Sequence, residues 1–312
     1  MGRAVITGAT GAIGRALVSE ALKYHEEVLV IVRRNSQRAE GLKQMKRCSV
    51  LEADLFEYPH IPELMEMQGL EGSGYDIFFH LAWMAPFGAD RNNLDLQLAN
   101  VQAALDAVRL AHKMGCRTFV GTGSQAEYGQ PEGALSPDTP AYPETGYGIS
   151  KLCAGQMTRL LCEQMEMRHI WTRILSVYGP YDRKETLIST AVINMLENKD
   201  TIFTPCNQIW DYLYSEDAAR AIYMAGEKGK NGAVYMIGSG ETRKLSEYIE
   251  VIAELTGYTK KIGFGRRAYN DKQVMYLKAD ISGLKRDTGF VPAVSFEEGI
   301  ERLIEFYRRQ LI

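Results

Sequence analysis

Apolar runs of strand length alternate along the first half of the chain with longer segments of helical periodicity. The predicted strands are RAVIT (3–7), EVLVIV (27–32), SVLEAD (49–54), YDIFFHLAW (75–83), RTFVGTG (117–123) and HIWTRILSVYG (169–179). Helical spacing predicts helices over 12–25, 94–115 and 146–167. Strands that are apolar throughout are typical of a parallel sheet with helices on both faces. The pattern predicts a doubly wound α/β fold, which binds ligands at the carboxyl ends of its strands.

The alternation of predicted strands and helices becomes less regular after about residue 180. Further helices are predicted over 186–199, 215–229, 245–257 and 295–310, and AVYMIG (233–238) is a predicted strand. Ser295 is the expected N-cap of the last helix, because Glu298 follows three residues on. We therefore expect a main domain over 1–179, with a return to its sheet near 212–239. A smaller C-terminal α/β lobe would make up most of 180–312.

Composition and charge narrow the classes of function. The chain has 312 residues and a net charge of −3, so no basic surplus exists to neutralise nucleic-acid phosphates. Its five cysteines form no CxxC pair, which argues against a zinc site and a disulfide framework and indicates a reducing, cytoplasmic environment. No apolar run approaches the roughly 18 residues of a membrane span, and the N-terminus lacks the pattern of a signal peptide. We expect a cytoplasmic protein with no metal, nucleic-acid or membrane partner.

The first predicted strand runs directly into TGATGAIG (7–14), whose three glycines open the first helix. Glycine lets the backbone approach a pyrophosphate closely, and a helix N-terminus offers free N–H groups and a partial positive charge. The alternative is a tight strand–helix turn that holds no ligand. Because strand, glycines and helix follow in the order of a βαβ unit, the segment predicts a Rossmann-type dinucleotide-binding domain. The residues expected to contact the dinucleotide here are Gly8, Thr10, Gly11, Ala12, Ile13 and Gly14.

The end of the second strand bears on which dinucleotide is bound. NAD sites usually carry Asp or Glu there for the ribose 2′-hydroxyl, whereas this chain has Arg33 and Arg34. Two guanidinium groups suit a 2′-phosphate through charge-assisted, bidentate hydrogen bonds. An exposed pair that merely follows a strand is the alternative, but the pattern favours NADP over NAD. Asp54 ends the third strand, where it is placed either to reach the adenine or to cap the next turn.

Tyr147 and Lys151 lie four residues apart in YGISK, on one face of the second long helix. A phenol with a pKa of about 10 is a poor acid at neutral pH. A neighbouring ammonium group favours the phenolate and lowers that pKa. The pair is therefore a usable proton donor for a carbonyl that accepts a hydride. Tyr128, in TGSQAEYG (122–129), has no lysine four residues on, and we expect it to be structural.

Together these motifs resemble those of the extended short-chain dehydrogenases/reductases, the NAD-dependent epimerase/dehydratase family, over nearly the whole chain. The matching segments are TGATGAIG (7–14), ADL (53–55), HLAW (80–83), Asn100, GSQAEYG (123–129), YGISK (147–151), RILSVYGP (173–180), WDYLYSEDAARA (210–221) and VYMIGSG (234–240). The resemblance implies that Ser124 hydrogen-bonds the substrate carbonyl, Tyr147 exchanges the proton and Lys151 also holds the nicotinamide ribose. It further implies cofactor contacts from Asp54, Leu55, Leu81, Ala82, Thr122, Ser176 and Val177.

Residues around these motifs are candidates for the substrate pocket. They are Trp83, Met84, Ser124, Gln125, Trp210 and Tyr212. Hydrophobic packing under a loop is the alternative role for Trp83 and Met84, and a strand-end cap is the alternative for Ser124.

The departures from the family pattern bear on the reaction. The family's sugar 4,6-dehydratases carry an adjacent Asp-Glu pair for elimination where this chain has Gln125 and Ala126, so dehydration is not expected. Many members that bind nucleoside-diphosphate sugars have an arginine where this chain has Trp210, and their frequent asparagine in RILSVYGP is Ser176 here. The segment VRR (32–34) resembles NADPH-dependent carbonyl reductases more than tightly NAD-bound epimerases.

We therefore predict an NAD(P)-dependent oxidoreductase, with NADP favoured, that reduces the 4-keto group of a nucleotide-linked deoxysugar. The first alternative is a nucleotide-sugar 4-epimerase that uses the same three residues twice and retains its cofactor. The second, of another class, is a regulatory protein that senses NADP without turnover. Helices corresponding to 94–115 and 147–168 commonly pair across a twofold axis in this family, so we expect a homodimer.

Overall fold

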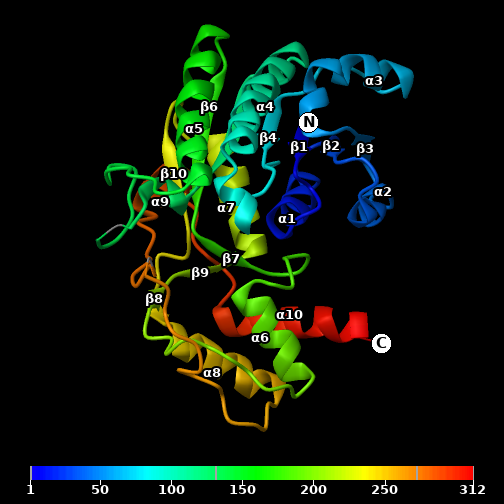
Figure 1. Cartoon of the computed structure of the whole chain (residues 1–312). Coiled ribbons are helices and arrows are strands. Elements are labelled where there is room, and N and C mark those ends of the chain that lie inside the picture. The colour runs from blue at the N-terminus through cyan, green and yellow to red at the C-terminus, as the bar shows by residue number, and fades with distance from the viewer. Residues whose placement is uncertain (1, 131, 272, 312) are drawn as a thin grey trace.

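A computed structural model describes residues 2–130, 132–271 and 273–311, the last residue for its backbone only. At its centre lies a seven-stranded sheet in the order β10-β6-β5-β4-β1-β2-β3, with every neighbouring pair parallel. The strands are β1 (Arg3–Thr7), β2 (Glu27–Val32), β3 (Cys48–Glu52), β4 (Ile77–His80), β5 (Thr118–Ser124), β6 (Arg168–Ile174) and β10 (Val234–Ile237). The strand order reverses between β1 and β4, where doubly wound sheets bind their ligands. This sheet confirms the predicted fold class (Figure 1).

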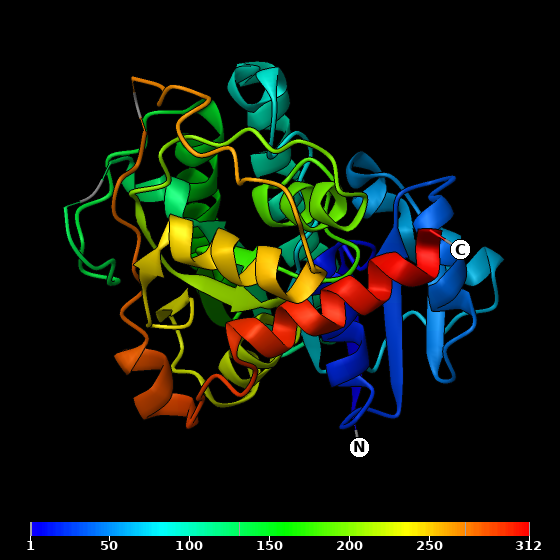
Figure 2. The ribbon, with the colours of Figure 1, turned by 90° about the horizontal axis from the view of Figure 1, so that it is seen from below.

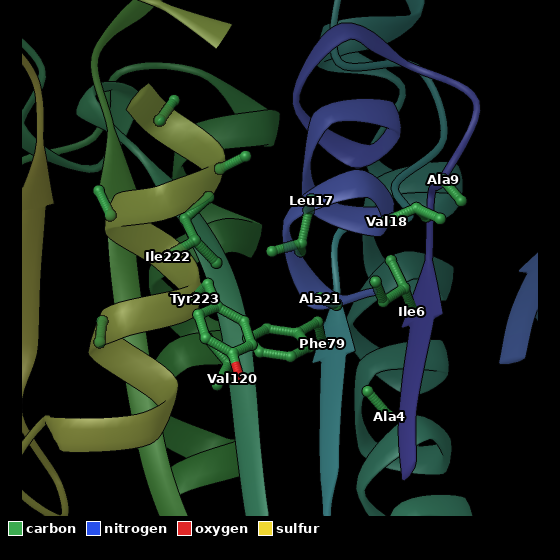
Figure 3. Close-up of a cluster of buried hydrophobic side chains, with 14 of the residues drawn as sticks. Ala4, Ile6, Ala9, Leu17, Val18, Ala21, Phe79, Val120, Ile222 and Tyr223 are labelled. Atoms are coloured by element: carbon green, nitrogen blue, oxygen red, sulfur yellow. The ribbon is translucent and has the colours of Figure 1, made fainter. Parts of the chain in front are cut away.

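Successive residues of each strand point to opposite faces of the sheet, and each face has its own hydrophobic core. In β1, Ala4 and Ile6 pack in one cluster, whereas Val5 packs in the other. The first cluster is covered by α1 (Ala12–Ala21), α2 (Glu40–Lys43), α7 (Ser215–Lys228) and α9 (Ser282–Thr288), and the second by α3 (Ile61–Met67), α4 (Leu94–Lys113) and α5 (Gly146–Gln164). Figure 3 shows Leu17 of α1 and Ile222 of α7 within the first cluster. None of the helices in the described ranges is long and apolar enough to cross a membrane.

A short 3-10 helix follows each of four strands at its carboxyl end. These helices are η1 (Gln37–Ala39) after β2, η2 (Leu55–His60) after β3, η3 (Ala89–Asn92) after β4 and η4 (Gln125–Tyr128) after β5. They carry several of the side chains that surround the ligand-binding edge of the sheet.

The predicted strand over 169–179 divides in the structure. The break falls at Leu175, after which the chain leaves the main sheet as β7 (Ser176–Tyr178) and pairs in parallel with β9 (Tyr212–Tyr214). The Leu175 N–H still donates to the Ile237 carbonyl of the main sheet at 2.9 Å. Its side chain, however, packs in a separate small apolar cluster. The apolar pattern of the segment predicted one continuous strand. It did not predict the turn at Leu175 from the main sheet toward the C-terminal lobe.

The C-terminal lobe lies at the carboxyl ends of the strands, below the main sheet in Figure 1. Its helices share one hydrophobic core, and α8 and α10 lie side by side in Figure 2. Its remaining elements are α6 (Leu187–Leu196), α8 (Leu245–Thr256), α10 (Phe296–Leu311), β8 (Ile209–Trp210) and β11 (Arg243–Lys244), the last two paired with each other. The Glu298 N–H donates to Ser295 Oγ at 3.2 Å, so the predicted cap of the last helix is confirmed.

Candidate active site

The glycine loop after β1 packs closely against the end of β4. Gly8 has a φ of +72°, and a Cβ there would meet the Ala82 nitrogen at 2.8 Å. A Cβ on Gly14 would meet the Gly8 carbonyl oxygen at 2.1 Å. A Cβ on Gly11, the N-cap residue of α1, has its nearest atom at 4.0 Å, and within the described ranges no side chain caps this helix. The loop is therefore closed toward the sheet and open at the helix N-terminus, which fits a pyrophosphate.

The chain bends across the glycine loop where β4 ends. The prediction extended this strand over 75–83, whereas the structure ends it at His80. The N–H groups of Leu81 and Ala82 both donate to Thr7 Oγ1 at 3.2 Å. These bonds turn the backbone away from the sheet, so that both residues line the groove above the loop.

Two adjoining pockets lie along the carboxyl ends of the strands. The first, of about 1270 Å³, extends from the glycine loop to the ends of β2 and β3. The second, of about 460 Å³, extends from the loop to the end of β5 and the start of α5. Of the predicted cofactor residues, the first is lined by Gly8, Thr10, Arg33, Asp54, Leu55, Leu81 and Ala82. The second is lined by Gly8, Gly11, Ala12, Ile13, Gly14, Leu81, Thr122, Tyr147, Lys151, Ser176 and Val177.

Arg34, unlike Arg33, lies outside the lining of both pockets. Its guanidinium donates to Glu57 from Nε at 2.9 Å and from Nη2 at 2.6 Å. The hydrogen bond from Arg34, followed by one from the Asp54 N–H, lowers the pKa of Glu57 to about 2. Of the two arginines predicted to face a 2′-phosphate, Arg33 therefore lines the pocket, whereas Arg34 is engaged by an acid on η2. The role of both in cofactor binding stays a prediction.

Arg38 was not among the predicted residues, yet it lines the first pocket together with Arg33 and Arg183. It lies on η1, and its Nη1 donates to the Tyr181 carbonyl at 3.0 Å. The first pocket is therefore lined by arginines from two segments far apart in the sequence, 33–38 and 183. A third basic residue soon after the second strand was the only signal for Arg38, and that signal was weaker than the adjacent Arg-Arg pair.

Ser124, Tyr147 and Lys151 all line the second pocket. Ser124 is the last residue of β5, and the other two lie one turn apart at the start of α5. Thr145 caps that helix, since its Oγ1 accepts from the Gly148 N–H at 3.1 Å. The structure thus brings together the three residues predicted to be catalytic. Thr145 determines where α5, the helix that carries Tyr147 and Lys151, begins.

Burial dominates the electrostatics of Tyr147 and Lys151. It raises the pKa of Tyr147, and the hydrogen bond with Ser124 and the charge of Arg91 oppose that rise without reversing it. Burial also lowers the pKa of Lys151 to about 7, with its Nζ donating to the Thr122 carbonyl at 2.6 Å. The sequence-based expectation that Lys151 depresses the pKa of the phenol is therefore corrected, because removal from water outweighs the nearby charges.

Glu127 is fully buried next to Ser124 and is absent from the residues predicted for the site. Its carboxylate accepts hydrogen bonds from the Ser124 N–H at 2.9 Å, from Trp171 Nε1 at 3.2 Å and from Arg173 Nε at 2.6 Å. Arg173 also donates to the Tyr128 hydroxyl at 2.7 Å, in agreement with a structural role for that tyrosine. Because a buried charge requires a partner, an arginine within the apolar run of β6 was the available signal for a buried acid.

Trp83 forms a wall of the site. Its ring centroid is 3.9 Å from Lys151 Nζ, and it lies edge-on to Tyr147 with centroids 6.2 Å apart. The indole Nε1 donates to Gln97 Oε1 on α4 at 2.9 Å, so the orientation of the ring is fixed. Trp83 lines both pockets, and Met84 lines the first.

The remaining predicted substrate residues divide between the pocket and its surroundings. Gln125 and Tyr212 line the second pocket, whereas Trp210 is outside the lining of both pockets. Trp210 Nε1 donates to Ser176 Oγ at 2.8 Å, and its ring packs against the core of the C-terminal lobe. Trp210 therefore holds the side chain of Ser176 by a hydrogen bond from outside the pocket.

Comparison with known proteins identifies relatives whose similarity extends over nearly the whole chain. A family model described as the NAD dependent epimerase/dehydratase family matches residues 4–238. A dTDP-glucose 4,6-dehydratase of Salmonella typhimurium is 26% identical, over 97% of this chain and 92% of the relative. A dTDP-4-dehydro-6-deoxyglucose reductase of Escherichia coli is 26% identical, over 97% of each chain.

Solved structures share the fold. The UDP-glucose 4-epimerase of Thermotoga maritima, solved with UDP-glucose, has a TM-score of 0.87 and 22% identity, over 99% of this chain and 100% of the other. MoeE5, solved with UDP-glucose and NAD, has a TM-score of 0.85 and 24% identity, over 100% of each chain. The family match extends from β1 to the end of the main sheet, so this chain belongs to the NAD dependent epimerase/dehydratase family and is an enzyme of that family.

Proposed function

We propose that the protein is a nicotinamide-dependent oxidoreductase that reduces the 4-keto group of a nucleotide-linked deoxysugar. One observation carries this proposal. The segment after β5 presents Ser124 and Gln125 to the second pocket, while its acid, Glu127, is buried on Arg173. The dehydratases that this chain resembles carry an Asp-Glu pair in that segment for elimination. The arrangement here supports carbonyl reduction without elimination.

The proposed roles follow from where the three polar groups lie. Tyr147 and Ser124 both line the second pocket. Ser124 orients the oxygen of the substrate carbonyl, and Tyr147 donates the proton that this oxygen requires. A bound nicotinamide supplies the hydride. Lys151 holds the Thr122 carbonyl and provides a buried positive charge whose protonation is poised near neutral pH. Lys151 is buried and Ser124 and Tyr147 are half-buried, so electrostatic contacts among them are stronger than on the surface.

We propose NADP as the cofactor in preference to NAD. The support is that Arg33 and Arg38 line the first pocket, and that arginine rather than a carboxylate follows the last residue of β2. A guanidinium group suits a phosphate through charge-assisted hydrogen bonds. The competing cofactor is NAD, which MoeE5 holds in its solved structure.

We propose a nucleotide-linked sugar as the substrate class. The relatives named for reactions on dTDP-linked and UDP-linked sugars extend over nearly the whole chain. Residues on the pocket walls are the proposed contacts, namely Trp83, Met84, Ser124, Gln125 and Tyr212. Trp210, which stands where many members have a diphosphate-binding arginine, is engaged by Ser176 and supplies no charge to this region.

The test is to incubate the purified protein with NADPH or NADH and a panel of nucleotide-linked 4-keto sugars. The proposal expects oxidation of NADPH, which is monitored as a decrease in NADPH absorbance. An equal amount of the sugar alcohol should form. A 4-epimerase would interconvert 4-epimers on a retained cofactor with no net oxidation of NADPH. NADPH binding without conversion of either kind of sugar would favour an NADP-sensing regulatory protein.

We also propose a homodimer formed through α4 and α5. Both helices carry large apolar side chains on their solvent side, namely Leu94, Leu98, Ile149, Met157 and Leu160. An exposed apolar surface of this kind marks an interaction site. Light scattering of the parent should give twice the mass of the chain, and Leu98→Lys should reduce it to that of one chain. A single-chain mass for the parent would reject the proposal.

A further inference from the structure

Arg91 places a positive charge beside Tyr147. It lies on η3, in the segment that follows β4, and lines the same pocket as Tyr147 and Ser124. Its Cζ is 4.9 Å from the centroid of the Tyr147 ring. A guanidinium at this distance is attracted by the ring, and more strongly once the phenol has lost its proton.

The backbone around Arg91 is fixed against the start of α5. The Gly146 N–H donates to Asn92 Oδ1 at 2.9 Å. A Cβ on Gly146 would meet the Arg91 carbonyl oxygen at 3.3 Å, so the two segments are in close contact. Gln97 on α4 also donates to the Asp90 carbonyl at 3.3 Å. Arg91 is therefore held in place relative to the residue that follows Gly146, which is Tyr147.

The guanidinium of Arg91 has no ion-pair partner among the described residues. Its Nε is buried and finds no hydrogen-bond acceptor there either. Buried donors are nearly always satisfied, and charges near the interior are usually paired. An arginine that stabilised the fold would be expected to have an acid beside it, as Arg173 has Glu127 at 2.6 Å. The position of Arg91 therefore requires a different explanation.

Lys151 is less well placed to act on the phenol. Its Nζ is 5.9 Å from the Tyr147 ring centroid and is engaged by the Thr122 carbonyl at 2.6 Å. The other polar groups that face Tyr147 are the Ser124 hydroxyl from β5 and the Glu127 carboxylate from η4, and Glu127 opposes ionisation of the phenol. Asp182 and Tyr212 line the same pocket. Arg91 is thus the nearer of the two cations placed beside the Tyr147 ring in the described part of the chain.

We propose that Arg91 is a positioning residue that stabilises the ionised form of Tyr147 and so sets the pH at which Tyr147 exchanges its proton. The consequence for the reaction rests on the proposed function, in which Tyr147 is the acid. In agreement with the geometry, the charge of Arg91 lowers the pKa of Tyr147, against the larger opposite effect of burial. Removing that charge raises the pKa of Tyr147 further, and a charge-conserving substitution restores part of the effect.

The test measures the ionisation of Tyr147 directly. Protein labelled with ¹³C at the tyrosine Cζ is titrated by NMR from about pH 8 to about two units above the ordinary phenol pKa of about 10, because burial raises the pKa of Tyr147. Tyr147→Phe identifies the resonance. Because an opposite charge within this distance shifts a pKa by about one unit or more, Arg91→Met should decrease the ionisation constant of Tyr147 about tenfold. Arg91→Lys should lie between the two. Arg109→Met, which removes an exposed arginine paired with Asp106, is the matched control and should leave the titration unchanged.

The same variants are then assayed in the alcohol-oxidising direction, where Tyr147 must be ionised to accept a proton. In Arg91→Met the pH profile of kcat/KM should move about one unit upward, with the rate recovering at high pH. An unchanged titration of Tyr147, or a raised KM with an unmoved profile, would overturn the proposal. If Arg91→Met does not fold, Arg91→Gln provides the same comparison. Turnover that persisted in Tyr147→Phe would refute the proposed function, while the NMR titration would still decide the coupling of Arg91 to Tyr147.

Discussion

Two ion pairs of equal length lie at opposite ends of the groove in very different surroundings. At the exposed end, beside β2 and β3, Arg34 Nη2 is 2.6 Å from Glu57, with the two side chains 43% and 32% exposed. At the buried end, beside β5 and α5, Arg173 Nε is 2.6 Å from Glu127, with exposures of 6% and 0%. Water screens the first pair, so this ion pair itself contributes little to stability. The second pair has no water to replace a lost partner.

The same contrast governs the titratable groups. At the exposed end a hydrogen bond from Arg34 lowers the pKa of Glu57 to about 2, which favours the ordinary charged form of an acid. At the buried end desolvation lowers the pKa of Lys151 to about 7, which favours an unusual neutral lysine. The groups at the exposed end therefore keep their ordinary charges near neutral pH. At the buried end the protonation of Lys151 changes near neutral pH, and perturbed groups of this kind are typical of functional sites.

The largest expected effect of a substitution that alters one end of the groove and not the other is on the turnover rate. Tyr147→Phe removes the proposed proton donor from the buried end and leaves the exposed end intact. The rate should fall by about 10²–10⁴-fold, the usual contribution of a general acid, with NADPH affinity unchanged. Steady-state assays and isothermal titration calorimetry measure the two quantities. A variant that lost affinity but kept its rate would place the chemistry elsewhere.

The second effect is on stability. Glu127→Ala leaves Arg173 buried without its partner and should cost about 3–5 kcal/mol of unfolding free energy. Arg34→Ala, which leaves Glu57 its hydrogen bond from the Asp54 N–H, is the control at the exposed end, and its effect should be about 1 kcal/mol or less. Urea unfolding monitored by circular dichroism provides both values. Equal losses in the two variants would show that burial does not distinguish the pairs.

The third effect is on the pH dependence of stability. The unfolded chain keeps Lys151 protonated up to about pH 10.4, whereas the folded chain does so only up to about 7. Between these values the unfolded state binds more protons, so the stability of the parent rises with pH. The stability advantage of Lys151→Met over the parent should therefore shrink by about 1 kcal/mol per pH unit above pH 7.

The control for that pH dependence is Lys43→Met at the exposed end, where Lys43 pairs with Glu52 at 3.0 Å. Its difference from the parent should stay flat between about pH 7 and pH 9, since the lysine is protonated in both states over that range. Unfolding curves at three pH values are sufficient. A flat difference for Lys151→Met as well would contradict the neutral lysine.

The smallest expected effect separates the two adjacent arginines. Arg33→Ser should weaken NADPH binding about tenfold, as the loss of one charge-assisted hydrogen bond predicts, and should leave NADH binding nearly unchanged. Arg34→Ser should alter neither affinity appreciably, because Arg34 is engaged by Glu57. Fluorescence titration with each cofactor compares the variants. Equal weakening of NADH and NADPH by Arg33→Ser would rule out a 2′-phosphate contact.

Much of the fold and part of the site could be predicted from local spacing. Continuous apolar runs predicted the strands of the main sheet, and helical periodicity predicted its long helices. A four-residue interval on one helix brought Tyr147 and Lys151 together. Neither pattern contains information about partners from other elements. The engagement of Arg34 by Glu57 and the burial of Glu127 on Arg173 depend on how separate strands and 3-10 helices pack.

The pKa shifts of the site residues also could not be predicted from local sequence patterns. Spacing indicated that a lysine lies near the phenol, and from this a lowered pKa was expected for Tyr147. The direction is the opposite, because burial is decided by the whole fold and outweighs one neighbour. Arg91, which contacts the Tyr147 ring from the segment after β4, lies too far away in the sequence for any local pattern to pair the two.

The central claim is that the buried end of the groove carries out hydride transfer to a sugar carbonyl. The most direct measurement uses NADPH deuterated at the transferable nicotinamide C4 position and a nucleotide-linked 4-keto deoxysugar, with the product analysed by mass spectrometry and NMR. We predict that the product alcohol carries one deuterium on the former carbonyl carbon. A product without deuterium at that carbon, or a sugar altered only at its stereocentre while the NADPH stays intact, would contradict the claim.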